Sequence, residues 1–146
     1  MDNVGVEVRR RMMQSVGSKD TAPELGLRKA LHGRGWRYRL HCRNLPGTPD
    51  IVFRKAKVAV FVHGCFWHRH PGCRRTTTSK SREAFWTAKF RANVDRDRRK
   101  ERELEASGWS PIVAWECEIA AELEAVVRRI EACVRRGTAR HDHRAR

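Results

Sequence analysis

The spacing of apolar residues divides the chain into helical and extended segments. Residues 21–33 begin with Thr21 and Glu24 in a capping-box pattern, continue with leucines one helical turn apart, and end at a glycine. On this pattern alone, Glu24 is a capping residue. Residues 81–106 and 119–134 are predicted as two further helices, and arginines cover much of the first of these.

Shorter segments with an extended pattern are predicted as strands at residues 36–40, 50–54, 58–62 and 109–115. The first alternates large and basic side chains, as a half-buried strand does. The third is a continuous apolar, β-branched run, which is typical of a buried strand. Pro111 lacks the N–H that a strand ladder needs, so it places the last strand at a sheet edge or at a bulge.

The turn-like residues 55–57 predict that the second and third strands form a hairpin. If Arg54 faces Val58 across this turn, antiparallel pairing places Asp50 opposite Val62. The Asp50 carboxylate and the Val62 carbonyl would then lie together, and a hard cation prefers such oxygen ligands. The alternative is a surface aspartate at the end of a strand.

The order of these elements predicts a mixed α/β sheet with helices outside it. Residues 21–134 are predicted as a single domain, between a basic N-terminal arm (residues 1–20) and a basic, disordered tail (residues 135–146). No apolar stretch is as long as a membrane span, and the N-terminus lacks the apolar core of a secretory signal. We therefore expect a cytoplasmic protein without membrane contact.

Charge narrows the class of partner. The 146 residues carry a formal net charge of +15, because lysine and arginine greatly outnumber the acidic residues. An excess of this size favours nucleic acid as the partner over a merely basic surface.

The cysteines and histidines after the third strand indicate a metal site. The five cysteines are an odd number, which argues against a disulfide framework and favours metal ligation. Cys65, His70 and Cys73 lie close together in sequence, and zinc prefers such ligands when it stabilises a fold. Cys117 is the best candidate for the fourth ligand, and His68 is an alternative to His70.

Together these features predict metal-assisted hydrolysis of a nucleic-acid backbone. Mg²⁺ is the hard cation that suits this chemistry, because it activates water and neutralises phosphate charge. His63 and His68 flank the first cysteine, and a histidine with a pKa near neutrality can act as a general base or donate to a phosphate.

Several segments between about residue 14 and residue 117 carry a family resemblance. They are KDTAPELGLRKALHGRGWRYRLH, LPGTPDIVF, VAVFVHGCFWHRH, FWTAKFRANVDRDRR and GWSPIVAWEC. These segments resemble the very-short-patch-repair (Vsr) mismatch endonucleases. The resemblance implies a restriction-endonuclease-like fold with a structural zinc site. It also implies an enzyme that nicks double-stranded DNA 5′ of the thymine in T:G mismatches, which arise when 5-methylcytosine deaminates.

The resemblance also implies roles for residues of the predicted nuclease site. Asp50 would bind Mg²⁺ together with the backbone carbonyl of Val62. His68 would activate the attacking water, and His63 would contact the scissile phosphate. The supporting acidic residues would be Glu24 and Asp97.

The same resemblance favours His70 over His68 as a zinc ligand, beside Cys65, Cys73 and Cys117. The spacing His70-Pro-Gly-Cys73 is one residue longer than in some relatives.

The resemblance also implies an aromatic wedge that would enter DNA beside the mismatch, and its residues would be Phe66, Trp67 and Trp86. Without the resemblance, the two tryptophans are core residues.

Two rival functions remain. One is a nuclease of the same fold without mismatch preference. The other is a non-catalytic, zinc-containing DNA-binding module, against which the presence of Asp50, His63 and His68 argues. We expect the protein to act as a monomer on DNA that contains a T:G mismatch, with other repair proteins as partners.

Overall fold

The computed structural model describes residues 19–78 and 80–144, and its elements follow the predicted order. They are α2 (Ala22–Gly33), β1 (Arg39–Leu40), β2 (Ile51–Phe53), β3 (Val58–His63), α3 (Glu83–Ala106), β4 (Ser110–Trp115) and α4 (Glu116–Arg144). The prediction of a mixed α/β fold is confirmed. Most of the predicted N-terminal arm lies outside the described residues. Among the residues described, no helix has both the length and the apolarity that crossing a membrane requires.

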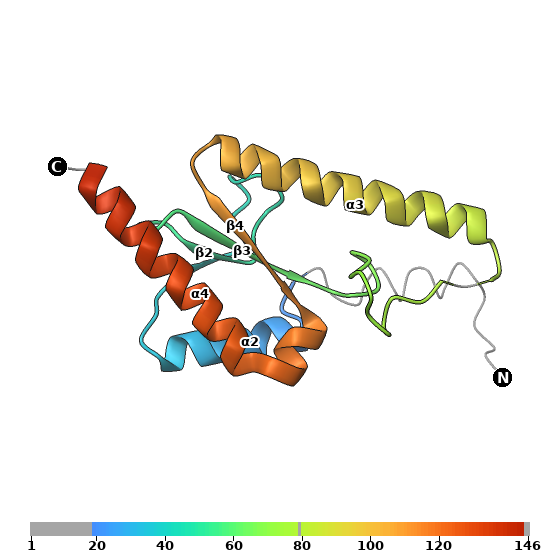
Figure 1. The fold of residues 1–146 in the computed structure, drawn as a ribbon, viewed down its shortest axis with the longest axis horizontal. Helices are drawn as coiled ribbons and strands as arrows, with labels where there is room; N and C mark the ends of the chain where they lie inside the picture. The colour runs from blue at the N-terminus through green and yellow to red at the C-terminus, as the bar shows by residue number, and fades with distance from the viewer. Residues whose placement is uncertain (1–18, 79, 145–146) are drawn as a thin grey trace.

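The strands form one four-stranded sheet in the order β1-β2-β3-β4. The first three strands are antiparallel neighbours. β4 runs parallel to β3, because α3 carries the chain back across the sheet between them (Figure 1). β4 is an edge strand of this sheet, and an edge tolerates Pro111 as predicted.

Side chains of β3 alternate between two apolar layers. Val58 and Val60 are fully buried in the larger core, which α2 and α4 complete on one face of the sheet. Ala59 and Phe61 point to the opposite face and pack with Leu104 of α3. Figure 1 shows the resulting three layers, with α3 on one side of the sheet and α2 and α4 on the other. Burial on both faces explains why the sequence of β3 is continuously apolar.

The hairpin between β2 and β3 forms as predicted, but its register differs. The Lys57 N–H donates to the Arg54 carbonyl over 3.2 Å, so the turn is tighter than the loop at 55–57 that the prediction assumed. Phe53, rather than Arg54, therefore pairs with Val58. The predicted pairing was wrong because turn geometry sets the register of a hairpin.

β1 is shorter than predicted and covers only Arg39–Leu40. The residues before it place their rings against β2 instead. Trp36 and Tyr38 each meet Phe53 edge to face, with ring centroids 6.1 and 6.0 Å apart. This packing replaces the strand pairing that the alternating pattern predicted.

α4 is longer than predicted and extends from Glu116 to Arg144, with a kink at Glu122. The prediction of a disordered tail was wrong for residues 135–144. The helix continues because its far half packs on the domain, where Val134 and Gly137 are buried. Charge composition alone does not reveal such docking.

Gly137 lies where α4 passes the hairpin turn. A Cβ added at Gly137 would clash with the backbone carbonyl oxygen of Ala56. We expect Gly137→Ala to lower the free energy of unfolding by roughly 1–3 kcal/mol, the usual effect of overpacking. Urea unfolding followed by circular dichroism measures this change.

Gly26→Ala is the matched control, since Gly26 also lies inside a helix and a Cβ there meets nothing within 4 Å. Alanine is the better helix former, so this variant should gain up to about 1 kcal/mol. Equal stabilisation by both substitutions would mean that α4 does not pack on the turn.

Candidate active site and metal centre

The Asp50 carboxylate lies against the backbone of β3 at the end where that strand finishes. The Val62 N–H donates to Asp50 Oδ2 over 2.8 Å, and the Asp50 N–H donates to the Val60 carbonyl over 3.0 Å. In an extended strand the N–H and C=O of one residue face the same edge. The Val62 carbonyl is therefore directed to the same side as Asp50, even though the predicted register was wrong. These two oxygen groups suit a hard cation.

Burial has the largest effect on the pKa of Asp50, whose side chain is largely shielded from water. It raises the pKa of Asp50 to about 6, whereas the hydrogen bond from Val62 lowers it. The nearby Glu24 carboxylate raises the pKa further, and His41 and His68 lower it. A cation beside Asp50 would stabilise its ionised form, because burial penalises an isolated charge.

His68 is oriented by a residue from the crossing helix. Its Nδ1 lies 2.7 Å from Asp97 Oδ2 on α3. A carboxylate that accepts from Nδ1–H leaves Nε2 unprotonated, so that nitrogen can take a proton. The geometry of a general base therefore exists at His68.

His63 stacks on His68, with ring centroids 3.8 Å apart and an angle of 4° between the planes. It is buried, and its Nδ1 has no hydrogen-bond partner within the described part of the chain. Burial, followed by the positive charge that His68 can carry, lowers the pKa of His63 to about 3, although Asp97 opposes this. His63 is therefore neutral near pH 7.

Glu24 and His41 extend the site on the α2 side. Glu24 is 1% exposed, and its Oε2 accepts a hydrogen bond from Arg28 over 3.0 Å. His41 Nε2 lies 2.9 Å from the same oxygen. The His41 N–H donates to the Asp50 carbonyl over 3.0 Å. Glu24 thus has more than the capping role, in which its N–H donates to Thr21 Oγ1 over 3.4 Å.

His41 was not among the predicted site residues. The signal was its position directly after the first strand. Leu40 pairs with Ile51 in the antiparallel β1–β2 ladder, so the residue that follows β1 must lie beside Asp50. Pairing the first two predicted strands would have found it.

Four soft or borderline ligands gather where β3 and β4 end. The ligand atoms of Cys65, His70, Cys73 and Cys117 lie within 4.8 Å of one another. His70 Nδ1 is 3.3 Å from Cys117 Sγ and 3.7 Å from Cys65 Sγ. The structure therefore brings His70, rather than His68, to the cysteines, despite the longer spacing before Cys73. Three sulfurs and one imidazole form a donor set that can hold a metal ion and that suits zinc.

Neighbouring groups hold this cluster in place. The Cys65 N–H donates to Glu116 Oε1 over 3.1 Å, which joins the loop to the first turn of α4. The Thr76 hydroxyl donates to the His70 carbonyl over 2.8 Å. The His70 ring stacks on Trp115, with centroids 4.3 Å apart. Supporting contacts of this kind orient metal ligands.

The three predicted wedge residues come together with a fourth aromatic side chain. Phe66 meets Trp67 and Phe90 edge to face, at 4.9 and 5.1 Å between centroids, and Trp86 stacks on Phe90 at 5.7 Å. We call Phe66, Trp67, Trp86 and Phe90 the aromatic cluster. Of the four rings only that of Phe90 is buried, so the other three are partly open to solvent. Figure 1 shows the loop that carries the first two beside the first half of α3.

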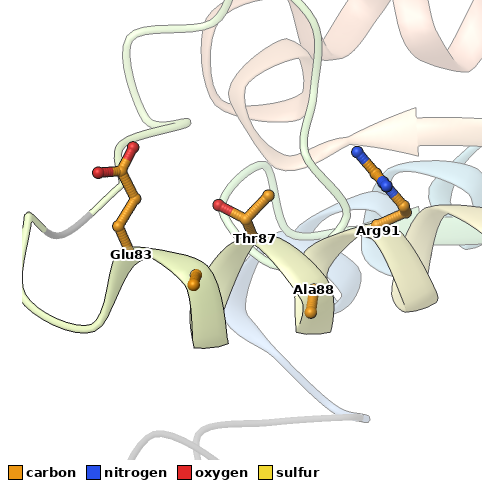
Figure 2. Close-up of a pocket in the computed structure, with 5 residues that line it drawn as sticks. Glu83, Thr87, Ala88 and Arg91 are labelled. Carbon is orange, nitrogen blue, oxygen red and sulfur yellow. The ribbon is translucent and has the colours of Figure 1, made fainter.

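A hollow of about 660 Å³ lies along the outer surface of α3. Figure 2 shows Thr87 and Arg91 on this surface, one helical turn apart. The hollow is lined by α3 alone and includes none of the predicted site residues. The side chains that could bind a metal ion or transfer a proton lie instead where β3 ends.

Known proteins with similar sequences are DNA mismatch endonucleases and nicking enzymes. A family model described as DNA mismatch endonuclease Vsr matches residues 1–75. Type II nicking enzyme V.XorIIP of Xanthomonas oryzae pv. oryzae is 50% identical over 131 residues, which is 88% of this chain and 96% of the relative. The DNA mismatch endonuclease Vsr of Escherichia coli is 36% identical over 127 residues, covering 84% and 81% of the two chains. Type II nicking enzyme V.NmeAIP of Neisseria meningitidis is 44% identical over 108 residues, covering 74% and 76%.

Proposed function

This chain belongs to the Vsr family of DNA mismatch endonucleases, and we propose that it nicks DNA 5′ of the thymine in T:G mismatches. The observation that carries the proposal is the convergence of Asp50, the Val62 backbone and the His63–His68 pair at one end of β3. A DNA-binding module would need none of these groups. The proposed architecture is restriction-endonuclease-like.

Mg²⁺ is the proposed catalytic cation, held by the Asp50 carboxylate and the Val62 carbonyl. The free oxygen of a buried carboxylate and a backbone carbonyl are suitable ligands, with water in the remaining positions. When bound, Mg²⁺ would neutralise charge on the scissile phosphate. Glu24 would add negative charge beside the cation site, which favours retention of the cation.

His68 is the proposed general base. It would take a proton from water at Nε2 while the water oxygen forms the new bond to phosphorus. The bond from phosphorus to the leaving oxygen breaks, and that oxygen takes a proton from solvent. The Asp97 carboxylate, 2.7 Å from Nδ1, would stabilise the resulting imidazolium. His63 stays neutral, so the stack avoids two adjacent positive charges, and its ring can donate to a phosphate oxygen.

The aromatic cluster is the proposed source of mismatch preference. Phe66, Trp67 and Trp86 would enter the helix beside the mispair, where unstacking is easier than in matched DNA. Exposed arginines of α3 would contact phosphates nearby. They include Arg91, Arg96, Arg98, Arg99 and Arg102.

We expect the enzyme to nick T:G duplexes in the presence of Mg²⁺ roughly a hundredfold faster than matched duplexes of the same sequence. This ratio corresponds to a difference of about 3 kcal/mol, of the order of the cost of unstacking a matched step. Single-turnover nicking rates on both duplexes, in several flanking sequences, measure it. Equal rates in every context would favour the nuclease without mismatch preference.

We expect Asp50→Asn to reduce the nicking rate by about a thousandfold or more, because a metal ion supplies several kcal/mol of transition-state stabilisation. Asparagine keeps the acceptor for the Val62 N–H, so DNA affinity should stay close to wild type. Asp95→Asn is the matched control, since Asp95 is exposed on α3, and it should nick normally. A fully active Asp50→Asn variant would refute the proposed cation site.

We propose that zinc occupies the Cys65–His70–Cys73–Cys117 cluster. Cys117→Ala should then lose the bound zinc and about 4 kcal/mol or more of stability, when zinc exceeds its dissociation constant about a thousandfold. Cys133→Ala is the control, because Cys133 lies outside the cluster. Metal analysis and urea unfolding test both variants. A metal-free wild-type protein of unchanged stability would contradict the proposal.

A further inference from the structure

Arg69 lies between His68 and His70 in the sequence, yet its side chain contacts the aromatic cluster. Its guanidinium carbon is 4.0 Å from the centre of the Phe90 ring and 5.5 Å from that of Phe66. A guanidinium at these distances attracts the electron-rich face of a ring. Arg69 therefore joins the loop after β3 to a buried ring of α3.

The same guanidinium also binds two stretches of loop backbone. Nη1 donates to the Phe66 carbonyl over 3.2 Å and to the Thr77 carbonyl over 2.8 Å. Nη2 donates to the Thr78 hydroxyl over 2.6 Å. The planar fork of arginine can reach three acceptors at once, whereas a lysine ammonium presents a single point charge.

The backbone at Arg69 is strained, with φ at 54°. A long side chain seldom adopts this left-handed conformation. Such strain persists only where surrounding contacts determine the conformation, and it is common at functional sites. The contacts of the guanidinium supply that restraint here.

We propose that Arg69 is a positioning residue for mismatch recognition. Its guanidinium holds Phe66, and through it Trp67, against α3, so the partly open rings meet DNA already oriented. This inference rests on the proposed wedge function. A wedge fixed before binding loses less conformational freedom on entering DNA than one that must be ordered at that moment.

The contacts favour this role over direct contact with phosphate. Three of the five N–H donors of the Arg69 guanidinium already serve two carbonyls and a hydroxyl, and its face packs on two rings, so at most two donors remain for DNA. Arg74 in the same loop is exposed and forms no ion pair or hydrogen bond within the described part of the chain. Arg74→Met therefore removes the same charge from the same loop without touching the cluster.

The test compares wild type with Arg69→Met, Arg69→Lys and Arg74→Met. The readout is the ratio of single-turnover nicking rates on T:G and matched duplexes. We expect both Arg69 variants to reduce this ratio roughly tenfold or more, within the range that small misplacements of a functional group cause. Arg74→Met should weaken binding to both duplexes alike and leave the ratio unchanged.

A spectroscopic arm separates positioning from general damage to the loop. 2-Aminopurine placed next to the T:G pair brightens when it unstacks, and Asp50→Asn proteins can be used so that the DNA stays intact. In that background, adding Arg69→Met should reduce the brightening at saturating protein. Zinc content and the urea midpoint should stay close to those of the parent protein.

The outcomes are distinguishable. If wild type does not discriminate between the duplexes, the proposed function fails. If wild type discriminates and both Arg69 variants do so equally well, only the role of Arg69 is overturned. Loss of zinc or of folding in Arg69→Met would be followed by the same measurements on Arg69→Lys, and unchanged discrimination by a folded Arg69→Lys would also overturn it.

Discussion

Hydrogen bonding of β3 along both of its edges is the constraint on which the site depends. β2 pairs antiparallel with one edge and β4 pairs parallel with the other. The start of β2 and the ends of β3 and β4 therefore meet at one end of the sheet. Asp50, His63 and Cys117 come from these three places. Groups that are far apart in sequence are thus spaced by strand geometry, and the cluster of Cys65, His70, Cys73 and Cys117 joins the loop that leaves β3 to the start of α4.

Charge is separated by depth in this protein. The chain as a whole carries +15, yet Glu24 and Asp50 are among its most buried polar residues. Buried carboxylates attract a cation strongly because little water screens them. Exposed arginines remain in solvent, where DNA phosphates approach and release their counterions. One chain therefore offers buried carboxylates that suit a small cation and exposed arginines that suit a large anion, and the two sets of groups are separate.

Features that depend on local pattern were predictable, and those that depend on tertiary packing were not. Asp50 lies beside the Val62 backbone as predicted, because a carboxylate side chain tolerates a small shift in register. The contact between Asp97 and His68 requires one particular position along α3 to lie beside the loop, and periodicity does not specify that position. The far half of α4 is ordered by its packing beside the hairpin turn. The surroundings of Arg69 combine a strained backbone with contacts to three segments, so no single stretch of sequence predicts them.

α3 carries both Trp86 of the aromatic cluster and Asp97, which orients His68. A helix rises 1.5 Å per residue, so these positions are separated by about 16 Å along one rigid rod. On the proposed roles, the first turn of α3 contacts the base step that is read, and the middle of the same helix orients the histidine that starts the cut. A shift or tilt of α3 would therefore move the reading rings and the support of the general base together, so recognition and chemistry share one rigid element.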